Sequence, residues 1–140
     1  MITARVKSAF FDRAAVQAAM DAATLKTLSR FGAFVRRRAQ TSMRRAGAVS
    51  QPGNPPSSHA GQLRDLLYFA WDNSTRSVVI GPIPFRDGVA PKLLEEGGEI
   101  IDRLRGRSVR KVYRARPYMK PAFDAELAKM PQGFKDAAKT

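Results

Sequence analysis

The feature that most constrains how this chain folds is a stretch without proline that runs from Phe10 to Arg45. Alanine, the residue with the highest helix propensity, is abundant in it, and Gly32 is its weak point. Apolar or small residues recur in steps of three and four, as on one face of a helix: Phe11, Ala14, Ala18, Ala22, Leu25, Leu28, Gly32, Val35 and Ala39. We therefore predict a long helix over residues 10–45, with Ser8 or Asp12 as its N-cap.

This predicted helix is longer than a compact domain requires. About 35 residues give a helix of roughly 50 Å, whereas a compact domain of 140 residues has a radius of gyration of about 14 Å. Two alternatives follow: either two helices are joined at residues 29–32, or one helix projects beyond its own domain. A projecting amphipathic helix needs a second surface to cover it, so the second alternative predicts an oligomer.

The residue content argues against several classes of function. The chain has 140 residues, enough for one domain, and contains no cysteine and a single histidine, His59. Disulfides, thiolate zinc sites and thiol catalysis are therefore excluded. His59 falls in an irregular segment, where we expect it to be solvated, so a histidine metal site or a catalytic triad is disfavoured. The chain also lacks a glycine-rich phosphate loop. We expect no enzymatic activity, no metal and no cofactor.

The hydropathy of the chain bears on where it resides. No apolar run is long enough for a membrane-spanning helix. Residues 1–7 lack the apolar core of a secretion signal. We therefore expect a protein that stays in the cytosol where it is made and has no membrane partner.

The net charge of +13 is concentrated in the first part of the chain. Residues 1–60 hold ten Lys and Arg and two acidic residues, and dense basic clusters occur at residues 36–45 and 103–116. These clusters indicate contact with nucleic-acid phosphates or with an acidic partner protein; the alternative is a solvated face that keeps the protein soluble. No aromatic residue interleaves with residues 36–45, so a base-stacking platform is not indicated there.

After the helix, the sequence predicts an irregular arm and then a hairpin. Residues 47–61 are rich in proline, glycine and serine and have no periodicity. Residues 63–71 are densely apolar, residues 72–75 are typical of a turn, and residues 77–80 are typical of a strand. We predict a β-hairpin with both strands largely buried. The prolines of residues 81–84 end its second strand, because proline cannot donate to a strand ladder.

The last part of the chain predicts a short helix, a second hairpin and a C-terminal helix. Pro91 suits the first turn and Gly97 the C-terminal end of a helix over residues 90–96. Residues 99–103 and 108–115 form the second hairpin, which turns at Gly106, and its second strand alternates poorly, as an edge strand does. Residues 119–129 form a helix with Ala122, Phe123, Leu127 and Met130 on one side. We expect residues 131–140 to be a frayed tail.

Together these elements predict a single α+β domain over residues 1–140. It contains the long N-terminal helix, a small antiparallel sheet of about four strands from two hairpins, a short helix and a C-terminal helix. The α+β body spans residues 62–130.

One group of acidic residues has two possible roles. Glu95, Glu96, Glu99 and Asp102 could hold Mg²⁺ in a nuclease. A helix followed by a strand would, however, spread these side chains over several faces. We therefore favour electrostatic pairing with the arginine-rich strand that follows them, or with a neighbouring subunit.

Four segments resemble, in the same order, the signature segments of one protein family. They are residues 52–65 (PGNPPSSHAGQLRD), 77–82 (SVVIGP), 90–98 (APKLLEEGG) and 115–122 (ARPYMKPA). The family is the phage neck and tail-completion family, the gene-product-ten-like tail components that join head to tail in long-tailed phages and prophages. The resemblance covers roughly residues 10–130. Ala60, Glu96 and Tyr118 stand where the family usually has threonine, an aromatic residue and phenylalanine.

The resemblance implies a structural virion protein at the phage head–tail junction. Such a protein would assemble, in the bacterial host cytoplasm, into a homo-oligomeric ring that joins the DNA-filled head to the tail, and would catalyse nothing. Its partners would be other copies and other neck and tail proteins, with passing contact to genomic DNA. We expect the subunit and partner interfaces to include Phe11, Leu25, Leu28, Val35, Arg36, Arg37, Pro55, Pro56, Leu63, Arg64, Glu95, Glu96, Arg116, Pro117 and Tyr118.

Two further expectations concern the arginines. Pro117 ends a strand and leaves Arg116 to pair with a carboxylate, for which Glu95 or Glu96, in the same subunit or across the boundary, is the expected partner. The basic helix either faces DNA or docks on an acidic neighbour. We favour docking, because DNA must slide through a neck channel. The alternative function is a nucleic-acid-binding protein that uses this helix.

Overall fold

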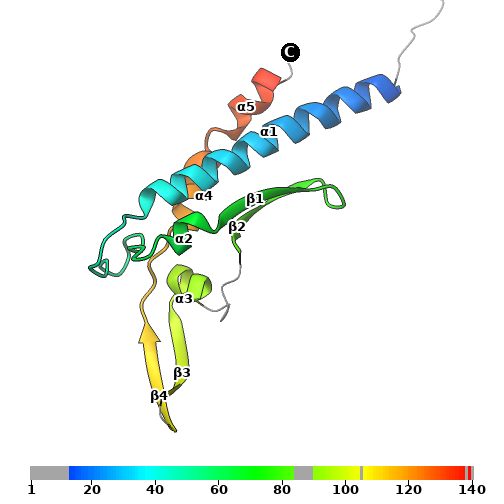
Figure 1. Cartoon of the computed structure of the whole chain (residues 1–140). Helices are drawn as coiled ribbons and strands as arrows, with labels where there is room; N and C mark the ends of the chain where they lie inside the picture. The colour runs from blue at the N-terminus through cyan, green and yellow to red at the C-terminus, as the bar shows by residue number, and fades with distance from the viewer. Residues whose placement is uncertain (1–12, 84–89, 105, 138, 140) are drawn as a thin grey trace, which may run out of the picture.

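The fold is built on one long helix. A computed structural model describes residues 13–83, 90–104, 106–137 and 139, and in it α1 (Arg13–Ser42) runs without a break (Figure 1). The predicted long helix is therefore confirmed over these residues, and the alternative of two helices joined at residues 29–32 is wrong. Phe11 and the two candidate N-caps, Ser8 and Asp12, lie outside the described residues.

A hairpin and two helices pack against α1 and form the core with it. The hairpin consists of β1 (Leu67–Asp72) and β2 (Ser77–Pro82), and the helices are α4 (Met119–Leu127) and α5 (Met130–Ala137). An ion pair between Arg76 and Asp21 (2.5 Å) also ties the turn of the hairpin to α1. The buried apolar residues come from α1 and from the segments beside it: Phe31, Val35, Ala39, Met43, Leu63, Leu67, Tyr118 and Ala122.

The segment before β1 differs from the prediction. Residues 63–66 were expected in the strand, but α2 (Gln62–Asp65) is a single helical turn. Gly61 adopts a left-handed φ of +82°, and its carbonyl accepts the backbone N–H of Asp65 at 2.9 Å. Glycine permits this conformation without a Cβ penalty, so the chain turns before it enters β1.

The first hairpin is covered on one face only. Because paired residues share a face, Phe69 and Ile80 lie with Val78 on the side of α1, whereas Tyr68 and Val79 are exposed on the other side. The prediction that both strands are largely buried is therefore wrong. Strand β2 also extends to Pro82, beyond its predicted end. Proline can occupy this position because the next hydrogen bond between the strands is donated by the backbone N–H of Ile83 to Leu66 O (2.9 Å), so no N–H of Pro82 is needed.

The second hairpin follows a helix with the predicted bounds, α3 (Ala90–Glu96). Strands β3 (Gly98–Leu104) and β4 (Arg107–Tyr113) pair antiparallel and extend away from α1 (Figure 1). The mixed α+β class and the two hairpins are confirmed. The four strands form two separate two-stranded sheets instead of one sheet.

The chain end also differs from the prediction. Residues 130–137 form α5 and pack on α1 instead of fraying. Pro131 lies in the first turn of α5, where proline is well suited, because the N–H it lacks has no partner there. In the described part of the chain, no helix is both long and apolar enough to cross a membrane.

Candidate interaction surfaces

The loop over residues 47–61 is tied to the body by hydrogen bonds at both ends. Arg116 Nε donates to Ser50 O (2.9 Å), Gly53 N donates to Ala115 O (2.9 Å), and Ser58 N donates to Arg44 O (2.9 Å). Arg116 therefore fastens the loop to the β4–α4 connection. The predicted pairing of Arg116 with Glu95 or Glu96 in the same chain is wrong.

Glu95 instead caps α4. Its Oε2 accepts the backbone N–H groups of Tyr118 and Met119 (both 3.0 Å), and its Oε1 accepts that of Lys120 (2.7 Å). The first N–H groups of a helix have no partner within the helix and favour a negative charge, and no side chain of α4 itself supplies that cap. Burial raises the pKa of the Tyr118 hydroxyl, and the charge of Glu95 adds to the shift.

Several predicted interface residues belong to the core of the chain itself. Val35, Leu63 and Tyr118 are buried in it, and Pro56 is buried in the loop. They are therefore not available to a partner. We predicted them from an apolar stripe and from motif residues, and neither signal separates a core face from an interface face.

Other predicted interface residues are partly or fully exposed. Arg36 is half-buried, because its Nε donates to Leu67 O (2.5 Å) and its guanidinium lies 5.4 Å from the centroid of the Tyr68 ring. Arg64 is also half-buried, and its carbonyl accepts a hydrogen bond from Gln40. The remaining predicted residues are exposed (Leu25, Arg37 and Glu96) or half-buried (Leu28, Pro55 and Pro117).

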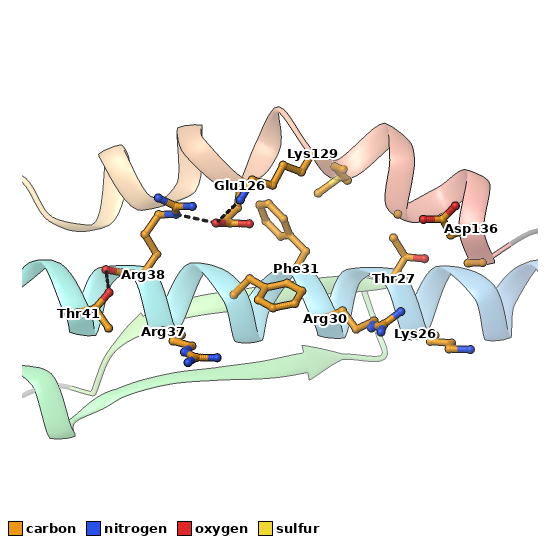
Figure 2. A pocket seen from close by; sticks show the side chains of 14 residues that line it. Lys26, Thr27, Arg30, Phe31, Arg37, Arg38, Thr41, Glu126, Lys129 and Asp136 are labelled. Atoms are coloured by element: carbon orange, nitrogen blue, oxygen red, sulfur yellow. Dashed lines mark hydrogen bonds and ion pairs between the residues drawn. The ribbon is translucent and has the colours of Figure 1, made fainter.

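A groove of about 730 Å³ lies between α1 and the pair α4–α5 (Figure 2). Its apolar lining includes Phe31, Phe34 and Met130. Phe31 packs edge-on against Phe123 of α4, with ring centroids 5.4 Å apart and planes at 84°. Phe34 keeps 52% of its surface exposed, whereas Phe31 is buried, so the apolar lining is open to solvent at Phe34.

The charged side chains of the groove form two groups, which Figure 2 separates, and Asp136 lies apart from both and accepts a hydrogen bond from Gln132 (2.8 Å). Arg38 Nε (2.6 Å) and Lys129 Nζ (3.3 Å) both donate to Oε1 of Glu126, which is buried between the helices. Burial alone would raise the pKa of Glu126, but the hydrogen bonds from Arg38 and Lys129 outweigh it and hold the pKa below its usual value. Sequence reasoning missed this cluster, although Glu126 follows the buried Ala122 by four residues, on the same helix side.

The second group lies along the rim of the groove, on α1. Lys26, Arg30 and Arg37 are exposed, and none of them forms an ion pair or hydrogen bond with any described residue. The hydroxyl of Thr27, on the groove wall, is buried and also lacks a hydrogen-bond partner among the described residues. The groove therefore combines an apolar lining with positive charge that its own acidic residues do not neutralise.

The β3–β4 hairpin carries the predicted pairing of acidic residues with the arginine-rich strand. Glu99 pairs with Arg110 on one face, and Asp102 pairs with Lys111 on the other at 2.7 Å. The hydrogen bond that Lys111 Nζ donates to Asp102, together with the charge of Asp102, raises the pKa of Lys111. Glu96 forms an ion pair with Lys92, with 3.9 Å between Glu96 Oε2 and Lys92 Nζ. The four acidic residues thus have separate partners, and no metal-binding cluster of three or more His, Asp or Glu occurs among the residues described.

The same hairpin exposes apolar side chains on both faces. Ile101 (73% exposed) and Val112 (67%) lie on one face, and Val109 (41%) lies on the other. The two strands of this hairpin pack mainly against each other, and Figure 1 shows the hairpin extending away from α1.

Comparison of the chain with protein-family models, with curated proteins and with solved structures finds no match in any of the three.

Proposed function

We propose that this chain is a structural subunit of the phage head–tail junction, which assembles into a ring in the host cytoplasm and joins the DNA-filled head to the tail. The observation that carries the proposal is the β3–β4 hairpin. It extends from the body with Ile101 and Val112 exposed on one face and Val109 exposed on the other. In this proposal the chain assembles with other copies and other neck proteins and catalyses no reaction.

The physical argument concerns how such a hairpin becomes stable. An isolated two-stranded hairpin is marginally stable in water, and exposed clusters of apolar side chains mark interaction sites. Docking the hairpin of one copy on the body of the next covers these side chains. Because the hairpin and the surface that receives it differ, the contact is heterologous, and its repetition closes a ring when the rotation allows it.

The resemblance to the neck family supports the proposal. The segment over residues 115–122, which resembles the closing signature of that family, connects β4 to α4, fastens the loop through Arg116 and places Tyr118 in the core. It therefore fixes the direction in which the hairpin leaves the body. A signature segment with this role suits a subunit whose hairpin must reach a neighbour.

The test is the mass of the purified protein in solution, alone and mixed with the proteins of neighbouring genes. We expect ring-sized assemblies for the unmodified chain and monomers for the double variant Ile101→Thr, Val112→Thr. Both side chains are exposed, so the variant should keep its free energy of unfolding within about 0.5 kcal/mol. The matched control is Val49→Thr with Val79→Thr, two equally exposed apolar residues outside this hairpin. A monomeric unmodified chain in every mixture would refute the proposal.

Nucleic-acid binding is the second candidate function. It is favoured by the net charge of +13 and by Lys26, Arg30 and Arg37 on α1, which form no ion pair with any residue that the structure describes. Titration against duplex DNA over a range of salt concentrations tests it. Sub-micromolar affinity that falls steeply with salt, as several counterions are released, would support this function.

A further inference from the structure

We infer that the groove between α1 and α4–α5 docks an acidic amphipathic helix of another protein. This inference deepens the proposed function, because it names the chemistry of one partner of the subunit. Two features of the groove lack a partner. Phe34 leaves half of its surface exposed to water, and none of Lys26, Arg30 and Arg37 forms an ion pair with a described residue.

The arrangement of the three cations fits a helix. They are four and seven residues apart on α1, so they lie on one side of that helix over about 16 Å. A second helix that runs alongside has the same repeat. It presents carboxylates with the same spacing when acidic residues occur four and seven positions apart. Each cation can then form a charge-assisted pair without distortion of either helix.

The apolar side chains that line the groove favour a partner helix with an apolar stripe. Phe31, Phe34 and Met130 line the groove between its charged side chains, and in helix-in-groove recognition the apolar face of a helix packs against such apolar side chains.

The observations favour a peptide over nucleic acid in this groove. A nucleic-acid backbone has no apolar stripe with which to cover Phe34. A helix with carboxylates on one side and leucines beside them meets both the cations of the rim and the apolar lining.

The test uses a designed peptide and the full chain. The probe is a fluorescent helical peptide of about four turns, with glutamates four and seven positions apart and leucines on the adjacent side. Its controls are a scrambled peptide of the same composition and a duplex DNA. We expect the probe to bind at least tenfold more tightly than the scrambled peptide, measured by fluorescence anisotropy at moderate salt.

Variants assign the binding to the groove. Arg30→Glu with Arg37→Glu should weaken binding of the probe more than tenfold, and Phe34→Ala should weaken it severalfold. The matched control, Arg13→Glu with Arg44→Glu, makes the same change in charge at exposed positions outside the groove and outside the β3–β4 hairpin, and should weaken it less than threefold. Circular dichroism confirms that each variant is folded.

Three results would overturn the inference. They are equal binding of the scrambled peptide, an equal effect of the control variant, and binding of DNA but not peptide through Arg30 and Arg37. The same peptide-binding assay is repeated with the Ile101→Thr, Val112→Thr variant, which we expect to be monomeric. Rings without peptide binding would refute this inference alone, whereas peptide binding by a chain that never forms rings would refute the proposed function alone.

Discussion

At the scale of single residues, Glu95 joins two elements that are distant in sequence. It belongs to α3, yet its carboxylate accepts three backbone N–H groups at the start of α4. We predicted this residue, or Glu96, as the partner of Arg116, because a carboxylate and a guanidinium form strong bidentate hydrogen bonds. The carboxylate instead accepts three amide N–H groups at the start of a helix, where the helix dipole also favours a negative charge. These hydrogen bonds join α3 to the start of α4.

Replacement of this carboxylate tests the cap. We expect Glu95→Ala to lower the free energy of unfolding by about 2 kcal/mol, since removal of a cap typically costs between about 0.5 and 2 kcal/mol and here three amides lose a charged acceptor. Urea unfolding measures the change. Glu95→Gln, which keeps one oxygen acceptor, should lose less, and Glu96→Gln at the exposed neighbouring position should lose almost nothing. A loss below about 0.5 kcal/mol for Glu95→Ala would contradict the capping role.

At the scale of elements, the sequence predicted what depends on local periodicity. The long helix, both hairpins and α3 follow from spacing and from turn residues that are close in sequence. What it could not predict depends on distant contacts. Nothing in either hairpin says that the two form separate sheets, and nothing in the 119–129 pattern says that Glu126 meets Arg38 across the groove.

Gly32, inside α1, is another position where a distant contact overrides the local pattern. Glycine weakens a helix, so this position was a candidate break, yet α1 continues through it. The structure gives the reason: a Cβ at Gly32 would lie 2.8 Å from Val78 Cγ2 and 2.9 Å from Phe69 Cδ2. The glycine therefore allows the first hairpin to lie close to α1. Its cost in helix propensity is offset by packing that no local pattern reveals.

This explanation predicts opposite results for two glycines. In Gly32→Ala, the gain in helix propensity is about 1 kcal/mol, but crowding against two side chains costs typically about 1–3 kcal/mol, so we expect a net loss of stability. The control is Gly133→Ala in α5, where the added Cβ would lie at an ordinary 3.4 Å from Thr27 Cγ2. It should be neutral or stabilising by up to about 1 kcal/mol. Thermal melts of both variants decide; equal stabilisation would contradict the packing role of Gly32.

At the scale of the whole molecule, two properties act on assembly in opposite directions. Eight buried apolar residues form the core, whereas fourteen large apolar residues are exposed among those described. Association of copies covers part of this exposed surface and is therefore favourable. Each copy also carries a net charge of +13, so approaching copies repel one another over a distance set by the ionic strength.

The dependence on salt therefore distinguishes the candidate functions. Raising the salt from about 0.05 M to about 0.5 M shortens the screening distance from about 14 Å to about 4 Å. We expect the ring fraction of the isolated chain to rise over this range, as measured by sedimentation, because repulsion weakens while the apolar contact persists. Binding to DNA, by contrast, falls with salt as counterions are released. The Ile101→Thr, Val112→Thr variant should remain monomeric throughout, since screening removes a repulsion but supplies no contact. Rings that dissociate as salt rises would mean that ion pairs, and not the exposed side chains of the β3–β4 hairpin, hold the copies together.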